Sequence, residues 1–119
     1  MIAGIGLDLI ELSRIEQSVK KNEKIVSRIL THKEKEIFDR FSSERRKLEF
    51  LAGRFAAKEA FAKAAGVGIG RLSFQHIEVL TNEGGAPFIT VKGYEDERIF
   101  ISITHSETYA AAQVVIEKG

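Results

Sequence analysis

The architecture expected of this chain is set by residues 43–70, SERRKLEFLAGRFAAKEAFAKAAGVGIG. Ser43 is a favourable N-cap and Gly66 a favourable C-terminal stop, so this stretch predicts one long helix that runs into a glycine-rich loop. Apolar residues recur at helical spacing on two faces, with Leu48, Leu51, Ala52, Phe55 and Ala62 on one and Phe50, Ala57 and Phe61 on the other. A helix with two apolar faces is expected to be covered on both sides, by a sheet and by other helices.

Glu59 is the first residue of this helix that indicates chemistry. Projected at about 100° per residue, it falls within the first apolar face, with Lys63 and Arg45 at the edge of that face. A carboxylate on the buried face of a helix is costly unless it is paired or binds a metal. The alternative is a simple helix ion pair between Glu59 and Lys63, which have favourable spacing.

Composition limits the classes of protein to consider. The 119 residues suit one domain, so we expect a single domain over residues 1–119. The formal net charge of +1 does not favour a nucleic-acid partner, and the absence of cysteine excludes disulfides and thiolate zinc sites. No apolar run reaches membrane-spanning length, and the N-terminus lacks the features of a signal peptide. We therefore expect a soluble, cytoplasmic protein that binds no membrane.

The N-terminal residues 1–10, MIAGIGLDLI, predict a buried strand. Side chains alternate along a strand, so one face carries Ile5, Leu7 and Leu9 and the other carries Gly4, Gly6 and Asp8. The two glycines leave open backbone where another chain or a ligand can approach. Asp8 either belongs to a site or caps the helix that follows, and the residues alone leave both interpretations open.

The helical middle of the chain begins with a helix expected over residues 13–22, where Ser13 and Glu16 have capping-box spacing. A short helix over residues 25–30 and another that starts at Thr31 precede the long helix. The first of these helices and its surroundings present the basic residues Arg14, Lys20, Lys21, Lys24 and Arg28. Such a surface is either simply solvated or docks an acidic partner.

The last third of the chain predicts antiparallel strands. Residues 74–80 and 88–92 flank a turn at residues 82–87 and read as a hairpin. A strand over residues 99–103 ends in Thr104, His105 and Ser106, and a final strand covers residues 109–116. The expected fold class is α+β, with an N-terminal strand, a helical middle containing one long helix, and C-terminal antiparallel strands.

The polar residues in apolar surroundings suggest a phosphate site. Asp8 and Glu59 suffice for Mg²⁺, which favours one or two carboxylates plus substrate phosphates and water. Cationic and backbone groups that suit phosphate oxygens are Lys63, Arg45, Arg54 and the loop glycines Gly66, Gly68 and Gly70. His105, next to Ser106, suits phosphate binding or proton transfer. The glycine loop lacks the strand-to-helix context of a nucleotide fingerprint, and a helix cap followed by a turn also explains it.

Three stretches in family order resemble the short bacterial 4′-phosphopantetheinyl transferases, the holo-[acyl-carrier-protein] synthase family. They are GIGLDLIEL at residues 4–12, EFLAGRFAAKEAFAKAAGVGIG at residues 49–70 and ISITHSETYAAAQVV at residues 101–115. The resemblance covers nearly the whole chain. It implies that 4′-phosphopantetheine passes from coenzyme A to a serine of apo-acyl carrier protein, in support of fatty acid biosynthesis, and that 3′,5′-ADP leaves.

The resemblance also implies roles for individual residues. Asp8 and Glu59 would hold the magnesium ion, and Lys63 would contact the same phosphates. The residues implied for the rest of coenzyme A, especially its 3′-phosphate, are Arg45, Arg54, Gly66, Gly68, His105 and Ser106. The base that deprotonates the carrier serine stays open between a metal-bound water and Glu59.

At the level of assembly, the resemblance implies a homotrimer with active sites between subunits. Acyl carrier protein would dock on the first helix, at Arg14, with Lys21 and Lys24 adding charge against an acidic helix of the carrier. Two positions depart from the expected pattern: Thr104 replaces a serine, and His76 stands where an acidic residue is common. Neither touches the proposed metal ligands. Two other readings are a non-catalytic oligomer that binds a phosphorylated metabolite and an interaction module that binds an acidic protein.

Overall fold

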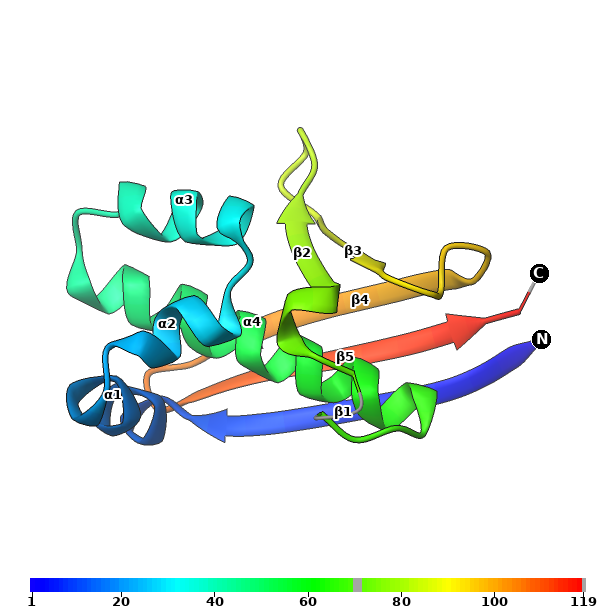
Figure 1. Ribbon diagram of the computed structural model, residues 1–119, viewed down its shortest axis with the longest axis horizontal. Coiled ribbons are helices and arrows are strands. Elements are labelled where there is room, and N and C mark those ends of the chain that lie inside the picture. The colour runs from blue at the N-terminus through cyan, green and yellow to red at the C-terminus, as the bar shows by residue number, and fades with distance from the viewer. Residues whose placement is uncertain (70–71, 119) are drawn as a thin grey trace.

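The computed structural model describes residues 1–69 and 72–118, and its fold is α+β as predicted. In chain order the elements are β1 (Ile2–Glu11), α1 (Leu12–Lys21), α2 (Lys24–Ile29), α3 (His32–Arg40), α4 (Glu44–Ala65), the short 3₁₀ helix η1 (Phe74–His76), β2 (Ile77–Thr81), β3 (Pro87–Val91), β4 (Arg98–His105) and β5 (Tyr109–Glu117). The two termini lie side by side at the end of the molecule opposite α1 (Figure 1). The N-terminal strand, the helical middle and the C-terminal antiparallel strands are all confirmed.

The long helix α4 begins and ends where the sequence predicts. Ser43 Oγ accepts a hydrogen bond from the backbone N–H of Arg46 at 3.2 Å. Gly66 ends the helix with φ of 74°, a left-handed conformation in which glycine carries no steric penalty. The last residue of the predicted stretch, Gly70, lies outside the described residues.

Strands β1, β5 and β4 form an antiparallel sheet in that order, and α4 packs along one face of it (Figure 1). Asp8 pairs with Ala112, which in turn pairs with Ile103 on β4. The face against α4 is the glycine face of β1. A Cβ added at Gly4 or Gly6 would lie 1.9 Å from the carbonyl oxygen of Ala64 or Ala60, respectively. These glycines therefore allow β1 to approach the backbone of α4 directly.

The prediction that β1 is buried is wrong for its apolar face. Ile5, Leu7 and Leu9 have 61%, 60% and 61% of their surface exposed. They lie on the outer side of the sheet, because the alternation that directs the glycines toward α4 directs these side chains away from it. The backbone opened by the glycines is occupied by a helix of the same chain.

The opposite side of α4 is covered by α1, α2, α3 and the β2–β3 hairpin, which projects away from the three-stranded sheet (Figure 1). Ile77 and Val79 of β2 are fully buried. A buried ion pair joins this layer to α4, because Lys58 Nζ lies 2.6 Å from Glu34 Oε1 and both side chains are 0% exposed. Burial on both sides of α4 is thus confirmed.

Two local predictions differ from the structure. Residues 74–76 form η1 rather than the start of a strand, so His76 is exposed on a turn and β2 begins at Ile77. Helix α1 begins one residue early, with Glu11 at its N-cap and no side-chain cap, so the Ser13 capping box is wrong. The Thr31–Glu34 capping box of α3 is confirmed.

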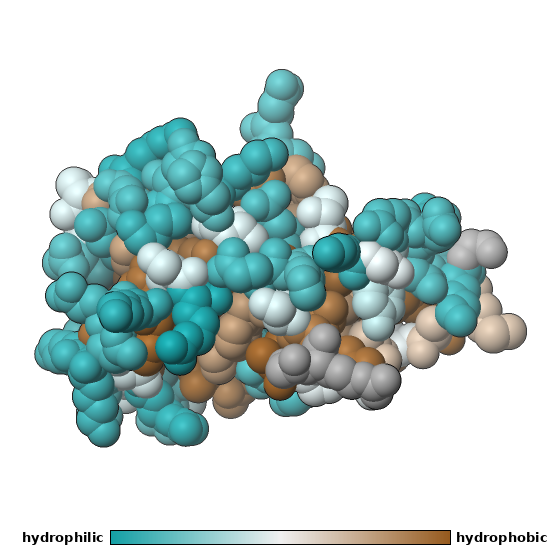
Figure 2. All heavy atoms as spheres, viewed as in Figure 1, coloured by the Kyte–Doolittle hydropathy of each residue, from teal (hydrophilic) through white to brown (hydrophobic). Residues whose placement is uncertain are grey.

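On the face of the molecule seen in Figure 2, hydrophilic side chains cover most of the helical end, and hydrophobic atoms are visible between them. Within residues 1–69 and 72–118, no helix combines the length and the apolar character needed to cross a bilayer.

Candidate active site

Asp8, Glu59 and Lys63 come together where β1 crosses α4. Lys63 Nζ lies 3.1 Å from Asp8 Oδ1 and donates a hydrogen bond to the carbonyl oxygen of Leu7 at 3.0 Å. The Asp8 side chain is only 14% exposed, whereas the Lys63 side chain is 55% exposed. Asp8 therefore does not cap α1, and Lys63 contacts the strand carboxylate instead of serving only as a helix partner of Glu59.

The electrostatics of Glu59 depend on the same three residues. Partial burial raises the pKa of Glu59, the nearby Asp8 carboxylate raises it further, and Lys63 lowers it. Two carboxylates close enough to interact in this way favour a bound cation, because a cation relieves their mutual repulsion. In the part of the chain that the structure describes, no group of three or more His, Cys, Asp or Glu side chains could hold a metal. Asp8 and Glu59 are thus a two-carboxylate donor set, which fits Mg²⁺ completed by phosphate and water oxygens.

Arg45, Glu49 and His105 form a second polar group at the N-terminal end of α4. Arg45 Nε donates a hydrogen bond to Glu49 Oε2 at 3.0 Å, and His105 Nδ1 lies 3.6 Å from the same oxygen. Arg45 Nη2 also donates to the carbonyl oxygens of Ser106 and Glu107, at 3.2 and 2.7 Å. These residues line a shallow hollow of about 630 Å³. The sequence analysis selected Arg45, His105 and Ser106 but missed Glu49, because a glutamate one helical turn after an arginine is ordinary on a polar helix surface.

The Asp8–Glu59–Lys63 group and the Arg45–Glu49–His105 group lie apart from each other on the chain. Glu49 and Glu59 are ten residues apart on α4, which corresponds to about 15 Å along the helix axis. The structure therefore brings Asp8, Glu59 and Lys63 together in one group and Arg45 and His105 in another, toward the two ends of α4.

The predicted residues Gly66, Gly68 and Ser106 lie in loops and turns at the ends of helices and strands. Gly66 and Gly68 are exposed beyond the C-terminal end of α4, and a Cβ added at either would meet no described heavy atom within 4 Å. Ser106 Oγ accepts backbone hydrogen bonds from Thr108 and Tyr109, at 3.2 and 3.1 Å, and so shapes the β4–β5 turn.

Arg54 is not brought to either group. It is 8% exposed, its guanidinium carbon lies 4.1 Å from the ring centre of Phe50, and its Nε donates to the carbonyl oxygen of Val79 at 3.3 Å. Burial lowers the pKa of Arg54, and the nearby Glu34 carboxylate raises it.

The predicted docking residues are accessible. Arg14 and Lys21 of α1 and Lys24 at the start of α2 are all exposed. They give this end of the molecule a cationic surface that suits an acidic partner.

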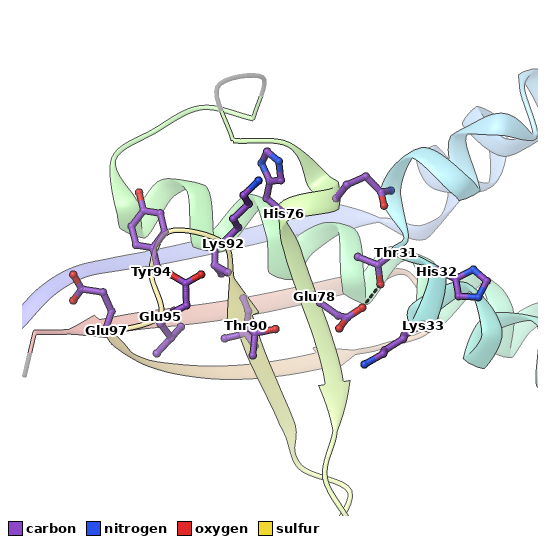
Figure 3. A pocket seen from close by; sticks show the side chains of 14 residues that line it. Thr31, His32, Lys33, His76, Glu78, Thr90, Lys92, Tyr94, Glu95 and Glu97 are labelled. Carbon is purple, nitrogen blue, oxygen red and sulfur yellow. Dashed lines mark hydrogen bonds between the residues drawn. The ribbon is translucent and has the colours of Figure 1, made fainter.

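A further hollow of about 660 Å³ lies between the start of α3 and the β2–β3 hairpin (Figure 3). Thr31 Oγ1 donates a hydrogen bond to Glu78 Oε2 at 2.6 Å within it, and His76 and Lys92 also line it. None of the predicted site residues lines this hollow.

Comparison with known proteins agrees with the family resemblance found in the sequence. The family model of the 4′-phosphopantetheinyl transferase superfamily matches residues 4–114. A holo-[acyl-carrier-protein] synthase of Oceanobacillus iheyensis is 56% identical over 117 residues, which are 98% of each chain. One from a Geobacillus species is 56% identical over 119 residues, covering 99% of this chain and 98% of the relative.

Solved structures agree with this result. The crystal structure of a holo-(acyl-carrier-protein) synthase from Bacillus anthracis in complex with CoA (3′,5′-ADP) superposes with a TM-score of 0.91 at 43% identity, over 100% of this chain and 99% of that one. That of Neisseria meningitidis gives 0.90 at 38% identity, over 99% and 100%. The chain belongs to the 4′-phosphopantetheinyl transferase superfamily.

Proposed function

We propose that this chain acts as a holo-[acyl-carrier-protein] synthase, with residues 1–119 as one catalytic domain. The serine oxygen of apo-acyl carrier protein attacks the phosphorus that bears the pantetheine arm of coenzyme A. The bond from that phosphorus to the bridging oxygen breaks, 3′,5′-ADP leaves, and the serine proton passes to a base. The relatives named above and the meeting of Asp8, Glu59 and Lys63 between β1 and α4 support this reaction.

Asp8 and Glu59 are the proposed magnesium ligands, since they are neighbouring carboxylates on two rigidly packed elements. Bound magnesium would supply Lewis-acid stabilisation of charge on the diphosphate. Lys63 keeps a half-exposed ammonium beside them and can turn from Asp8 to a phosphate oxygen. It would then neutralise the charge that gathers on the leaving group.

For the rest of coenzyme A, we propose contacts with Arg45, His105 and Ser106 and with the open backbone at Gly66 and Gly68. Arg45 supplies a guanidinium and His105 an imidazole next to a hollow, which suits the 3′-phosphate. Arg54 is left out of these contacts because its guanidinium is held in the interior of the chain.

We propose that the acyl carrier protein docks on the exposed basic surface of Arg14, Lys21 and Lys24. Charged contacts of this kind mainly raise the association rate and the specificity. We place the reaction in the cytoplasm, which the lack of cysteine in the chain favours.

We further propose a homotrimer with active sites between subunits. The outer face of the sheet presents Ile5, Leu7 and Leu9, each about 60% exposed, together with Phe100, which is 49% exposed. An apolar face of this kind is typical of an interaction surface. The separation of the two polar groups along α4 suits sites completed by a neighbouring subunit.

The Glu59→Gln variant tests the role of Asp8 and Glu59 in transfer. Glutamine keeps the size of the side chain and replaces the charged carboxylate ligand by a neutral amide, so we expect a folded protein with transfer reduced by at least about a hundredfold. Intact-mass analysis of the carrier measures transfer, and circular dichroism checks the fold. Turnover near the wild-type level would refute the proposed metal role.

A further inference from the structure

Glu49 lies between Arg45 and His105 and faces both side chains through a single oxygen atom. Its Oε2 accepts a hydrogen bond from Arg45 Nε at 3.0 Å and lies 3.6 Å from His105 Nδ1. The Glu49 side chain is 18% exposed, compared with 47% for Arg45 and 51% for His105. A carboxylate that is more buried than both partners can fix their orientation, since its own movement is restricted.

The contacts of Arg45 leave one end of its guanidinium for a ligand. Nε is held by Glu49, and Nη2 donates to the carbonyl oxygens of Ser106 and Glu107. A guanidinium has five N–H donors in a rigid plane, so three fixed contacts also fix the direction of the remaining nitrogen, Nη1. Among the described residues, Nη1 makes no hydrogen bond within the chain.

The imidazole of His105 faces the same Glu49 oxygen at the longer distance of 3.6 Å. Glu49 faces Nδ1, so a proton on Nδ1 points toward the carboxylate and Nε2 points away from it. The two nitrogens of a histidine differ in this respect, because the partner of one sets the orientation and protonation of the other. When both nitrogens carry protons, Nε2 becomes a donor for an anion.

We propose that Glu49 is a positioning residue that holds Arg45 Nη1 and His105 Nε2 toward the hollow lined by these side chains, so that both contact the 3′-phosphate of coenzyme A. This proposal rests on the proposed function. A carboxylate next to an anion site would weaken binding if it acted by its charge alone. Here its charge is balanced by the Arg45 guanidinium that it holds, so its net effect is to orient the donors toward the phosphate.

The test compares wild type with Glu49→Ala, using coenzyme A and 3′-dephospho-coenzyme A as alternative substrates. For coenzyme A we expect KM to rise about tenfold, the scale of one charge-assisted hydrogen bond, with kcat within about twofold. Kinetics with the dephospho substrate should stay within about twofold, because that substrate lacks the phosphate that Arg45 and His105 contact. The preference for coenzyme A should therefore fall about tenfold.

Two further variants make the result specific. Glu49→Gln keeps an oxygen for Arg45 Nε, so it should retain more of the preference than Glu49→Ala does. Asp39→Ala removes another ion pair of the same spacing, Lys35–Asp39 at 2.9 Å, and should leave the preference unchanged. Equal losses for both substrates in Glu49→Ala would indicate a merely structural role, and an unchanged preference would likewise overturn the proposal.

A binding measurement separates this proposal from the proposed function. Calorimetry with 3′,5′-ADP and with AMP reports recognition of the 3′-phosphate without any transfer. Glu49→Ala should lose about tenfold in affinity for 3′,5′-ADP and little for AMP. If wild type transfers nothing to the carrier, the proposed function fails, whereas an unchanged affinity of Glu49→Ala for 3′,5′-ADP overturns the role of Glu49.

Discussion

Replacing Gly6 by alanine tests how closely the strand that carries Asp8 must approach α4. The added Cβ would lie 1.9 Å from the carbonyl oxygen of Ala60 and 2.8 Å from the backbone nitrogen of Ala64. Both are backbone atoms of a helix and cannot rotate away. Because an ordinary contact begins at 3.4 Å, β1 must move about 1.5 Å away from α4, the difference between 3.4 Å and 1.9 Å.

Two effects follow from that displacement. Overpacking of this kind costs about 1–3 kcal/mol in the free energy of unfolding. Asp8 lies two residues after Gly6 on the same face of β1, so it moves relative to Glu59 and Lys63 as well. A misplacement of about 1 Å in a catalytic site costs on the order of a hundredfold in turnover. Denaturant unfolding measures the first effect, and kcat/KM for carrier modification measures the second.

Gly53→Ala is the matched control. The Cβ added there would lie 3.2 Å from Cγ2 of Ile103, a side-chain methyl group that can shift. The free energy of unfolding should stay within about 1 kcal/mol of wild type, since alanine is also the better helix former. If Gly6→Ala proved as stable and as active as Gly53→Ala, the direct packing of β1 on α4 would not be what positions Asp8.

Three other outcomes are expected. Burial and the nearby Asp8 raise the pKa of Glu59, and magnesium binds its deprotonated carboxylate. Magnesium affinity, measured by calorimetry, should therefore fall as pH falls through that raised pKa. A pH-independent affinity would argue against Glu59 as a ligand. Arg14→Ala should weaken carrier binding severalfold in surface plasmon resonance and leave coenzyme A binding unchanged. The control Arg40→Ala on α3 should change neither affinity. An equal loss of affinity for carrier and coenzyme A in Arg14→Ala would refute a docking role. Leu7→Glu places a charge on the outer sheet face and should dissociate the proposed trimer, as measured by light scattering; an unchanged mass would exclude that face as the proposed interface.

The sequence predicts much of this fold because local signals agree with the tertiary structure. Ser43 and Gly66 bound α4, and the Thr31–Glu34 capping box starts α3, since capping depends on neighbouring residues. Turn residues also locate the β2–β3 hairpin correctly. What local patterns could not settle is which face of β1 is covered, because alternation defines two faces without saying where the helix lies.

The candidate site likewise combines residues that the sequence indicates with contacts that only the structure shows. Glu59 stands out because a charge interrupts an apolar stripe, and Asp8 because it follows two glycines in a strand. Their meeting depends on the close packing at Gly4 and Gly6, which only the three-dimensional structure establishes. Glu49 carries no such signal, since a glutamate one turn after an arginine on a polar helix start is ordinary. Its contact with His105 joins segments that are distant in the sequence.

The most direct test of the proposed function is the intact mass of an apo-acyl carrier protein after incubation with this protein, coenzyme A and magnesium. We predict an increase equal to one phosphopantetheine arm, which disappears when a chelator removes the metal. An unchanged carrier mass with folded protein would contradict the transfer reaction and favour a protein that only binds a phosphorylated metabolite. An increase that persists with the chelator would contradict the role given to Asp8 and Glu59.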